Sequence, residues 1–256
     1  MRRNKIKQKY LNLISSNNDN KISIIVSDTE KKIIKGLISF LLIFLMLFWS
    51  VIPSVVLKII GINPNNLSSI VKYVITFAND ILFLVLLIGI YYKDLKDNLK
   101  KYFKCNLKNN IKTSIAYWLI GLGIMMASNY LIAIVTNGQL ADNEEAVRSM
   151  VDIAPLYMAF QLIVYAPLSE ELIFRRSFRD IFKNKWTFAI ISGVVFGGLH
   201  AITSITDMVS LLYLIPYCSL GIVFGLLYYK TNNIFSTIVI HAIHNSMALV
   251  LYLLTL

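Results

Sequence analysis

The three histidines of this 256-residue chain, His200, His241 and His244, all lie in strongly apolar stretches, and the glutamate pair Glu170 and Glu171 ends another. A carboxylate and imidazole groups together can activate a water molecule and stabilise the negative charge that develops on a carbonyl oxygen. A charged side chain at the centre of a bilayer costs about 2.5 to 3.5 kcal/mol, so ionisable residues there mostly have a function. If these stretches cross a membrane, the five side chains are candidates for acyl hydrolysis.

The two glutamates differ in their local surroundings. On a helix, Glu171 and Arg175 are four residues apart with the acid first, which is the favourable direction for an ion pair. Glu170 is turned about 100° away and has no such partner. A carboxylate without a local partner in a low-dielectric environment suits a general base or a ligand. The alternative is an interfacial pair whose side chains reach water beside Arg175 and Arg176.

The histidines have a helical spacing of their own. Phe196 and His200 are one turn apart, and the two glycines between them allow a neighbouring helix to come close. His241 and Asn245 share a helix face and could donate two hydrogen bonds to one oxyanion. His244 does not share this face, which favours a structural role. For each histidine the alternative is a hydrogen bond that only joins two helices.

The elements that must position these residues are long and apolar. Hydrophobic residues make up 57% of the chain and charged residues 15%, against about 45–50% and 25% in soluble domains. Each apolar run is long enough to approach or cross a hydrocarbon core of about 30 Å as a helix. The composition predicts an all-α, polytopic transmembrane bundle of about seven spans, with six or eight as alternatives. The runs are residues 36–57, 70–92, 113–136, 153–174, 186–203, 208–229 and 234–254.

The net charge of +11 carries a signal about orientation. Alternating spans place 22 of the 25 Lys and Arg residues on one side, so the positive-inside rule predicts a cytoplasmic N-terminus. Basic loops against an anionic leaflet account for the charge without nucleic acid. We expect a flexible basic cytoplasmic arm over residues 1–35 and one transmembrane domain over 36–256, with its chemistry at about 153–254. The two cysteines form no disulfide framework.

Depth in the membrane poses a geometric problem for a shared site. Counted from the cytoplasmic ends of their runs, Glu170 and His241 lie roughly 8 to 12 Å deep and His200 near 22 Å. A common site therefore predicts a tilted or broken fifth helix, with Gly193 and Gly197 as kink positions. A separation of more than about 8 Å between His200 and Glu170 would exclude the shared site.

Taken in order, the motifs Glu170-Glu171-x-x-x-Arg175, Phe196-x-x-x-His200 and His241-x-x-x-Asn245 resemble the CPBP family. This family of type II CAAX prenyl endopeptidases and bacteriocin-processing or self-immunity proteins is also called Abi. The likeness covers about a third of the chain, roughly residues 161–247.

The resemblance implies a role for each motif residue. Glu170 and His200 would orient and deprotonate the attacking water, and Arg175 would hold Glu171. His241 and Asn245 would bind the oxyanion.

The resemblance leaves the question of a metal open, because the family has been described both as zinc proteases and as glutamate proteases. Glu170, His200 and His241 could supply three zinc ligands and leave a fourth position for water. The more specific HExxH signature is absent, as are GxSG and GxGD patterns of other intramembrane proteases. The cofactor is therefore either none or Zn²⁺.

These observations predict an intramembrane endopeptidase in a bacterial plasma membrane. The composition, rich in Lys, Asn and Ile, suggests an AT-rich bacterium, so we expect pheromones, bacteriocin precursors or other membrane-anchored peptides as substrates rather than prenylated proteins. One alternative is a non-enzymatic membrane protein that confers bacteriocin immunity or regulates a sensor kinase. Another is a cation or proton transporter that uses Asp80 of the second run as part of a relay. For Asp80 itself, a structural role is the favoured interpretation.

Overall fold

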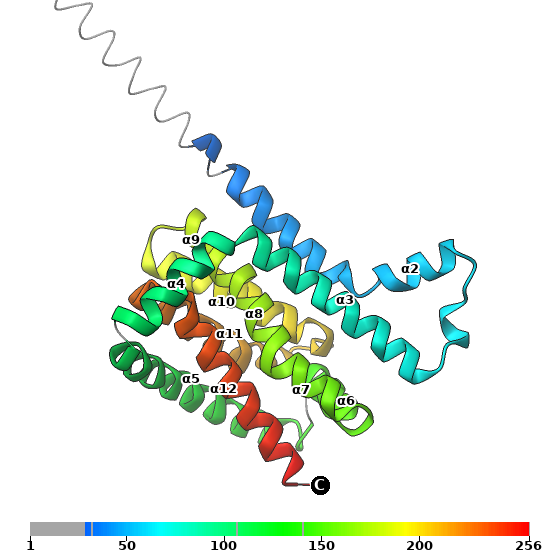
Figure 1. The fold of residues 1–256 in the computed structure, drawn as a ribbon. Coiled ribbons are helices and arrows are strands. Elements are labelled where there is room, and N and C mark those ends of the chain that lie inside the picture. The colour runs from blue at the N-terminus through cyan, green and yellow to red at the C-terminus, as the bar shows by residue number, and fades with distance from the viewer. Residues whose placement is uncertain (1–28, 32, 106, 140, 256) are drawn as a thin grey trace, which may run out of the picture.

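The structure of the chain, a computed structural model, describes residues 29–31, 33–105, 107–139 and 141–255. Every regular element in these ranges is a helix, and the helices pack side by side as a bundle (Figure 1). The all-α, polytopic bundle predicted from the apolar runs is confirmed. Most of the predicted basic arm, residues 1–28, lies outside the described part of the chain.

The first predicted span is two helices rather than one. A helix over Thr29–Trp49 is followed by a turn and by the short helix α2 (Ile52–Ile59), so the single helix expected over 36–57 is wrong. Pro53 explains the break, because it has no N–H for the carbonyl of Trp49 and its ring would clash with that carbonyl. After a 3₁₀ turn at Pro64–Asn66, the helix α3 (Ser69–Ile90) returns along the first helix.

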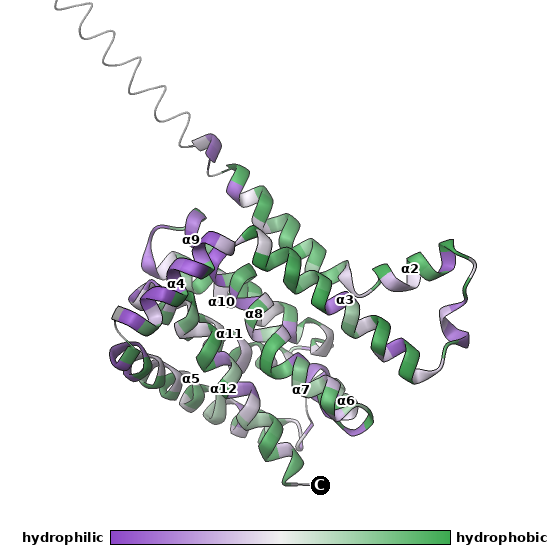
Figure 2. Cartoon of the chain, viewed as in Figure 1, coloured by the Kyte–Doolittle hydropathy of each residue, from purple (hydrophilic) through white to green (hydrophobic). Residues whose placement is uncertain are grey.

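Two helices connect this hairpin to the rest of the bundle. The polar helix α4 (Tyr92–Cys105) precedes the long apolar helix α5 (Leu107–Val135). Asn98 of α4 accepts the main-chain N–H of Ile234 at 3.1 Å and so caps the start of the last helix. Figure 2 shows hydrophilic residues gathered on α4 and α9, whereas α3 is mostly hydrophobic.

The segment that ends in the glutamate pair is helical but irregular. It starts after α6 (Asp142–Ile153), and wide π-helical turns separate three short α-helices. It is not among the six described helices that are long and apolar enough to cross a membrane. Its elements are α7 (Pro155–Phe160), the π turn η2 (Gln161–Tyr165), α8 (Ala166–Glu170), the π turn η3 (Glu171–Ser177) and α9 (Phe178–Ile181).

The last three long helices complete the bundle, and the first two of them pack closely against each other. They are α10 (Lys185–Ala201), α11 (Leu214–Thr231) and α12 (Ile234–Leu253), with 3₁₀ turns at Ile202–Ser204 and Ser210–Tyr213 between the first two. A Cβ atom on Gly193 would lie 2.4 Å from the Ile222 nitrogen, and one on Gly197 would lie 2.5 Å from the Cys218 nitrogen. These glycines therefore let the backbones of α10 and α11 approach each other. Of the two predicted forms of this helix, tilted or broken, the break is wrong, because α10 is continuous through both glycines. The tilt stays a prediction.

Candidate active site

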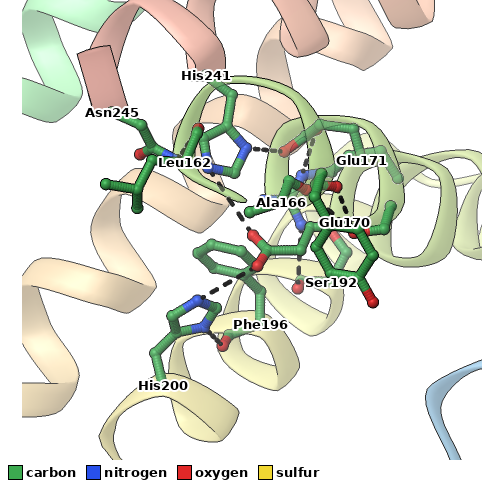
Figure 3. Close-up of polar contacts among 12 residues, drawn as sticks. Leu162, Ala166, Glu170, Glu171, Ser192, Phe196, His200, His241 and Asn245 are labelled. Atoms are coloured by element: carbon green, nitrogen blue, oxygen red, sulfur yellow. Dashed lines mark hydrogen bonds and ion pairs between the residues drawn. The ribbon is translucent and has the colours of Figure 1, made fainter. Parts of the chain in front are cut away.

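The carboxylate of Glu170, at the end of α8, lies between two imidazoles from other helices. Its Oε1 is 3.7 Å from Nε2 of His200 on α10, and its Oε2 is 3.8 Å from Nε2 of His241 on α12 (Figure 3). The distances satisfy the limit of about 8 Å set for a shared site. Glu170 thus has partners in space although it has none on its own helix.

Glu171, Arg175 and His241 form a second, more deeply buried group. The side chains of Glu171 and Arg175 are fully buried and pair at 3.3 Å, as their spacing predicts. The other Glu171 oxygen lies 3.0 Å from Nδ1 of His241. Arg175 also donates to the Ser192 carbonyl at 3.4 Å and lies 4.9 Å from the Phe196 ring centroid. The pair therefore orients the His241 ring from behind, so that its Nε2 faces Glu170.

His200 is held by contacts on α10 and α11. Its Nδ1 donates to the Phe196 carbonyl at 2.9 Å, and the two rings lie 4.3 Å apart. Tyr217 of α11 also stacks on the His200 ring, with ring centroids 5.5 Å apart. The hydroxyl of Tyr217 accepts a hydrogen bond from Asn143 at 3.5 Å. Tyr217 belongs to none of the motifs predicted from the sequence, and only its contact with His200 identifies it.

The side-chain amide of Asn245 already makes one hydrogen bond within the protein. Its Nδ2 donates to the main-chain carbonyl of Leu162 at 2.9 Å (Figure 3), so one of its two N–H bonds is already used. Asn245 remains on the same face of α12 as His241, one turn away.

Two other candidates lie outside the Glu170 group. Trp118 donates to Nδ1 of the buried His244 at 3.2 Å, which joins α5 to α12. Buried Asp80 accepts hydrogen bonds from Tyr157 at 2.8 Å and Gln161 at 2.5 Å. Both candidates therefore make contacts that join helices.

The predicted difference in membrane depth between Glu170 and His200 becomes smaller because the helical segment that contains Glu170 is longer than predicted. The predicted end at Phe174 is too early, because the helical segment continues to Ile181. Glu170 then lies about 16 Å, and His200 about 22 Å, from the ends at Ile181 and Lys185, at about 1.5 Å per residue. The extension, rather than a broken α10, brings their levels closer.

The three proposed zinc ligands can be tested against this geometry. Among the residues that the structure describes, no group of three or more His, Cys, Asp or Glu side chains has an arrangement that could hold a metal ion. The Nδ1 atoms of His200 and His241 have protein partners, and both Nε2 atoms face Glu170. Metal-binding histidines make the same kind of hydrogen bond with their second ring nitrogen, so these contacts do not distinguish the two cofactor alternatives, and the choice between no metal and Zn²⁺ stays a prediction.

Taken together, the apolar helices and the enclosed acid–imidazole group define a multi-pass membrane protein with a hydrolase-like polar centre. Comparison with known proteins agrees. The family described as type II CAAX prenyl endopeptidase Rce1-like matches residues 152–247, which contain every motif residue. No solved structure matches the chain.

The similar proteins are bacterial. UPF0177 protein YxdF of Lactococcus lactis is 31% identical over 147 residues, which cover 55% of this chain and 78% of the relative. Putative membrane peptidase YdiL of Bacillus subtilis is 28% identical over 164 residues, 62% of this chain and 63% of the relative. UPF0177 protein YbdI of L. lactis is 25% identical over 178 residues, 68% of this chain and 94% of the relative. The chain belongs to the CPBP family of CAAX-type membrane proteases.

Proposed function

We propose that this protein is an intramembrane endopeptidase in which Glu170 activates the water that attacks a peptide bond. The observation that supports this most directly is the position of the Glu170 carboxylate between Nε2 atoms of His200 and His241, at 3.7 and 3.8 Å. These separations are longer than a direct hydrogen bond and suit contact through one water molecule.

The partners of the two Nδ1 atoms constrain where the protons lie. Nδ1 of His200 faces the Phe196 carbonyl and Nδ1 of His241 faces the Glu171 carboxylate, so each Nδ1 carries a proton. In a neutral ring, Nε2 then has a free lone pair and accepts a hydrogen bond from water. In a doubly protonated ring, Nε2 donates instead. Each imidazole can therefore hold a water beside Glu170 or donate to a negative oxygen.

Glu171 holds Nδ1 of His241 at 3.0 Å, and Nε2 of the same ring faces Glu170 at 3.8 Å. An N–H at this Nε2 position is directed toward the space beside Glu170, where it can donate to an oxyanion.

Hydrolysis of the peptide bond then proceeds in two proton transfers. Water held by Glu170 and His200 transfers a proton to Glu170 as its oxygen bonds to the scissile carbonyl carbon. The carbonyl oxygen becomes an oxyanion, to which His241 and Asn245 donate hydrogen bonds. Return of the proton to the amide nitrogen breaks the C–N bond as the oxyanion re-forms the carbonyl, and leaves a carboxylic acid and an amine.

We propose membrane-associated peptides, such as pheromones or bacteriocin precursors, as the substrate class. The apolar surroundings of Glu170 favour a substrate that already lies in the bilayer. The proposal assigns water activation to Glu170, because its carboxylate lies between the two Nε2 atoms.

Purified protein, assayed with a library of quenched fluorescent peptides in detergent, tests this proposal. We expect cleavage that persists after treatment with a chelator and is lost in Glu170→Ala. Loss of cleavage on chelation would contradict the metal-free mechanism. Absence of cleavage by the wild-type protein, together with an unaffected cellular role for Glu170→Ala, would favour the non-enzymatic alternative.

A further inference from the structure

The helical segment that leads to Glu170 has an unusual hydrogen-bond register. The main-chain N–H of Ala166 donates to the carbonyl of Gln161, five residues back, which is a π-helical bond. In this register the next N–H, that of residue 167, would donate to the carbonyl of Leu162. Residue 167 is a buried proline, which has no N–H. The π register and Pro167 together leave the Leu162 carbonyl without a main-chain donor.

A buried carbonyl without a main-chain donor generally finds another partner. Here the partner is the side chain of Asn245 on α12, whose Nδ2 lies 2.9 Å from the Leu162 oxygen (Figure 3). The contact joins the irregular segment to α12 one turn from His241. It also fixes which end of the Asn245 amide faces Leu162. If the amide were flipped, two acceptor oxygens would oppose each other.

We propose that Pro167 is a positioning residue, which orients the Asn245 amide through the carbonyl it leaves free. One N–H of Asn245 is held by Leu162, and the planar amide then directs its second N–H along a single direction. The proposal rests on the proposed function, in which that second N–H donates to the oxyanion. Orientation before the reaction matters because donors that are already aligned need no rearrangement as charge develops.

The same turn is held from its other side. The side chain of Gln161, the residue before Leu162, donates to Asp80 of α3 at 2.5 Å, and Tyr157 donates to the same Asp80 oxygen at 2.8 Å. The buried Asp80 therefore helps to fix the position of the π turn, and this role needs no proton transfer.

The substitution Pro167→Ala tests the proposal because it restores an N–H that competes with Asn245 for a helix carbonyl. Pro155→Ala is the matched control, since Pro155 lies in the first turn of α7, where main-chain N–H groups have no helical acceptor. Both are compared with wild type and Asn245→Ala for kcat and KM on a peptide that the library assay identifies. A double variant, Pro167→Ala with Asn245→Ala, tests whether the two residues act together.

We expect Asn245→Ala to lower kcat about 10²-fold, the scale for removal of an oxyanion donor, and Pro167→Ala to lower it about 10-fold, each with KM unchanged. Pro155→Ala keeps the wild-type kcat, and Pro167→Ala has no further effect when Asn245 is already Ala. A wild-type kcat in Pro167→Ala, or the same 10-fold loss in both backgrounds, would overturn the proposal.

A second measurement separates this proposal from the proposed function. In protein labelled with ¹⁵N-asparagine, the side-chain NMR signals of Asn245 are assigned by their loss in Asn245→Asp. We expect one downfield N–H, from the bond to Leu162, which moves upfield in Pro167→Ala and is unchanged in Pro155→Ala. An unshifted signal in Pro167→Ala overturns the role of Pro167, even if the enzyme is active. The expected shift in a protein that cleaves no peptide would leave Pro167 as the residue that orients Asn245 and refute the proposed activity instead.

Discussion

Replacement of Gly197 by alanine is a sharp test of how α10 is positioned. A Cβ atom there would lie 2.5 Å from the nitrogen and 2.7 Å from the Cα of Cys218. Ordinary contacts of this kind are about 3.5 Å, so α10 and α11 must separate by about 1 Å. Such overpacking costs about 1–3 kcal/mol. Because His200 lies one turn further along α10, we also expect Gly197→Ala to lower kcat by up to about 10²-fold.

The neighbouring residue provides a matched control. A Cβ atom on Gly198 would have no atom within 4 Å, so Gly198→Ala adds a methyl group without a clash. Alanine favours a helix over glycine by about 0.8–1.0 kcal/mol, so this variant is expected to be slightly more stable than wild type.

Thermal unfolding in detergent, followed by tryptophan fluorescence, measures both glycine variants. We expect a Tm several degrees below wild type for Gly197→Ala and at or above wild type for Gly198→Ala. Equal Tm values for wild type and Gly197→Ala, or equal losses in the two variants, would refute the close approach of α10 and α11.

Three further outcomes follow from the described contacts. Glu171→Gln leaves the fully buried Arg175 without its counter-charge and should cost about 3–5 kcal/mol by thermal unfolding, whereas loss of both charges, Glu171→Gln with Arg175→Met, should cost less. Asp80→Asn keeps an acceptor oxygen and should retain at least half of the wild-type cleavage rate, where a transporter that relays protons through Asp80 would lose its transport. Burial alone would raise the pKa of Asp180, but the charges of Arg176 and Lys35 and the hydrogen bonds that they donate together outweigh it, so this pKa lies below its usual value of about 3.9. The stability that ionised Asp180 contributes is therefore present above the usual pKa and is lost as the pH falls through the lowered pKa. The Tm difference between wild type and Asp180→Asn should shrink on acidification and not on alkalinisation.

The sequence predicts the helical architecture well because membrane-spanning helices need long apolar runs, which are visible directly. The runs at 70–92 and 234–254 correspond closely to α3 and α12. Local interruptions were harder to predict. The break before Pro53 follows from one proline within an otherwise uniform apolar run. The π turns around Glu170 change the hydrogen-bond register with no change in hydrophobic character.

The candidate site shows the same division between local and tertiary information. The spacing of Glu171 and Arg175 predicts their ion pair, because both residues lie on one helix. The partners of Glu170 lie 30 and 71 residues further along the chain, so only the packed structure reveals them. The spacing of His241 and Asn245 gives their shared face. It does not reveal the bond from Asn245 to Leu162, which depends on the register of another helix.

The central claim is that the Glu170 carboxylate activates water, and kcat of Glu170→Gln on a peptide cleaved by the wild type measures it most directly. Gln keeps the size and hydrogen-bonding capacity of the side chain but removes its basic carboxylate. Glu145→Gln, at an exposed carboxylate of α6, is the control. We predict that Glu170→Gln folds with a Tm near that of wild type and loses about 10²–10⁴-fold in kcat, while Glu145→Gln keeps the wild-type rate. A Glu170→Gln variant that cleaves the peptide at the wild-type rate would contradict the account.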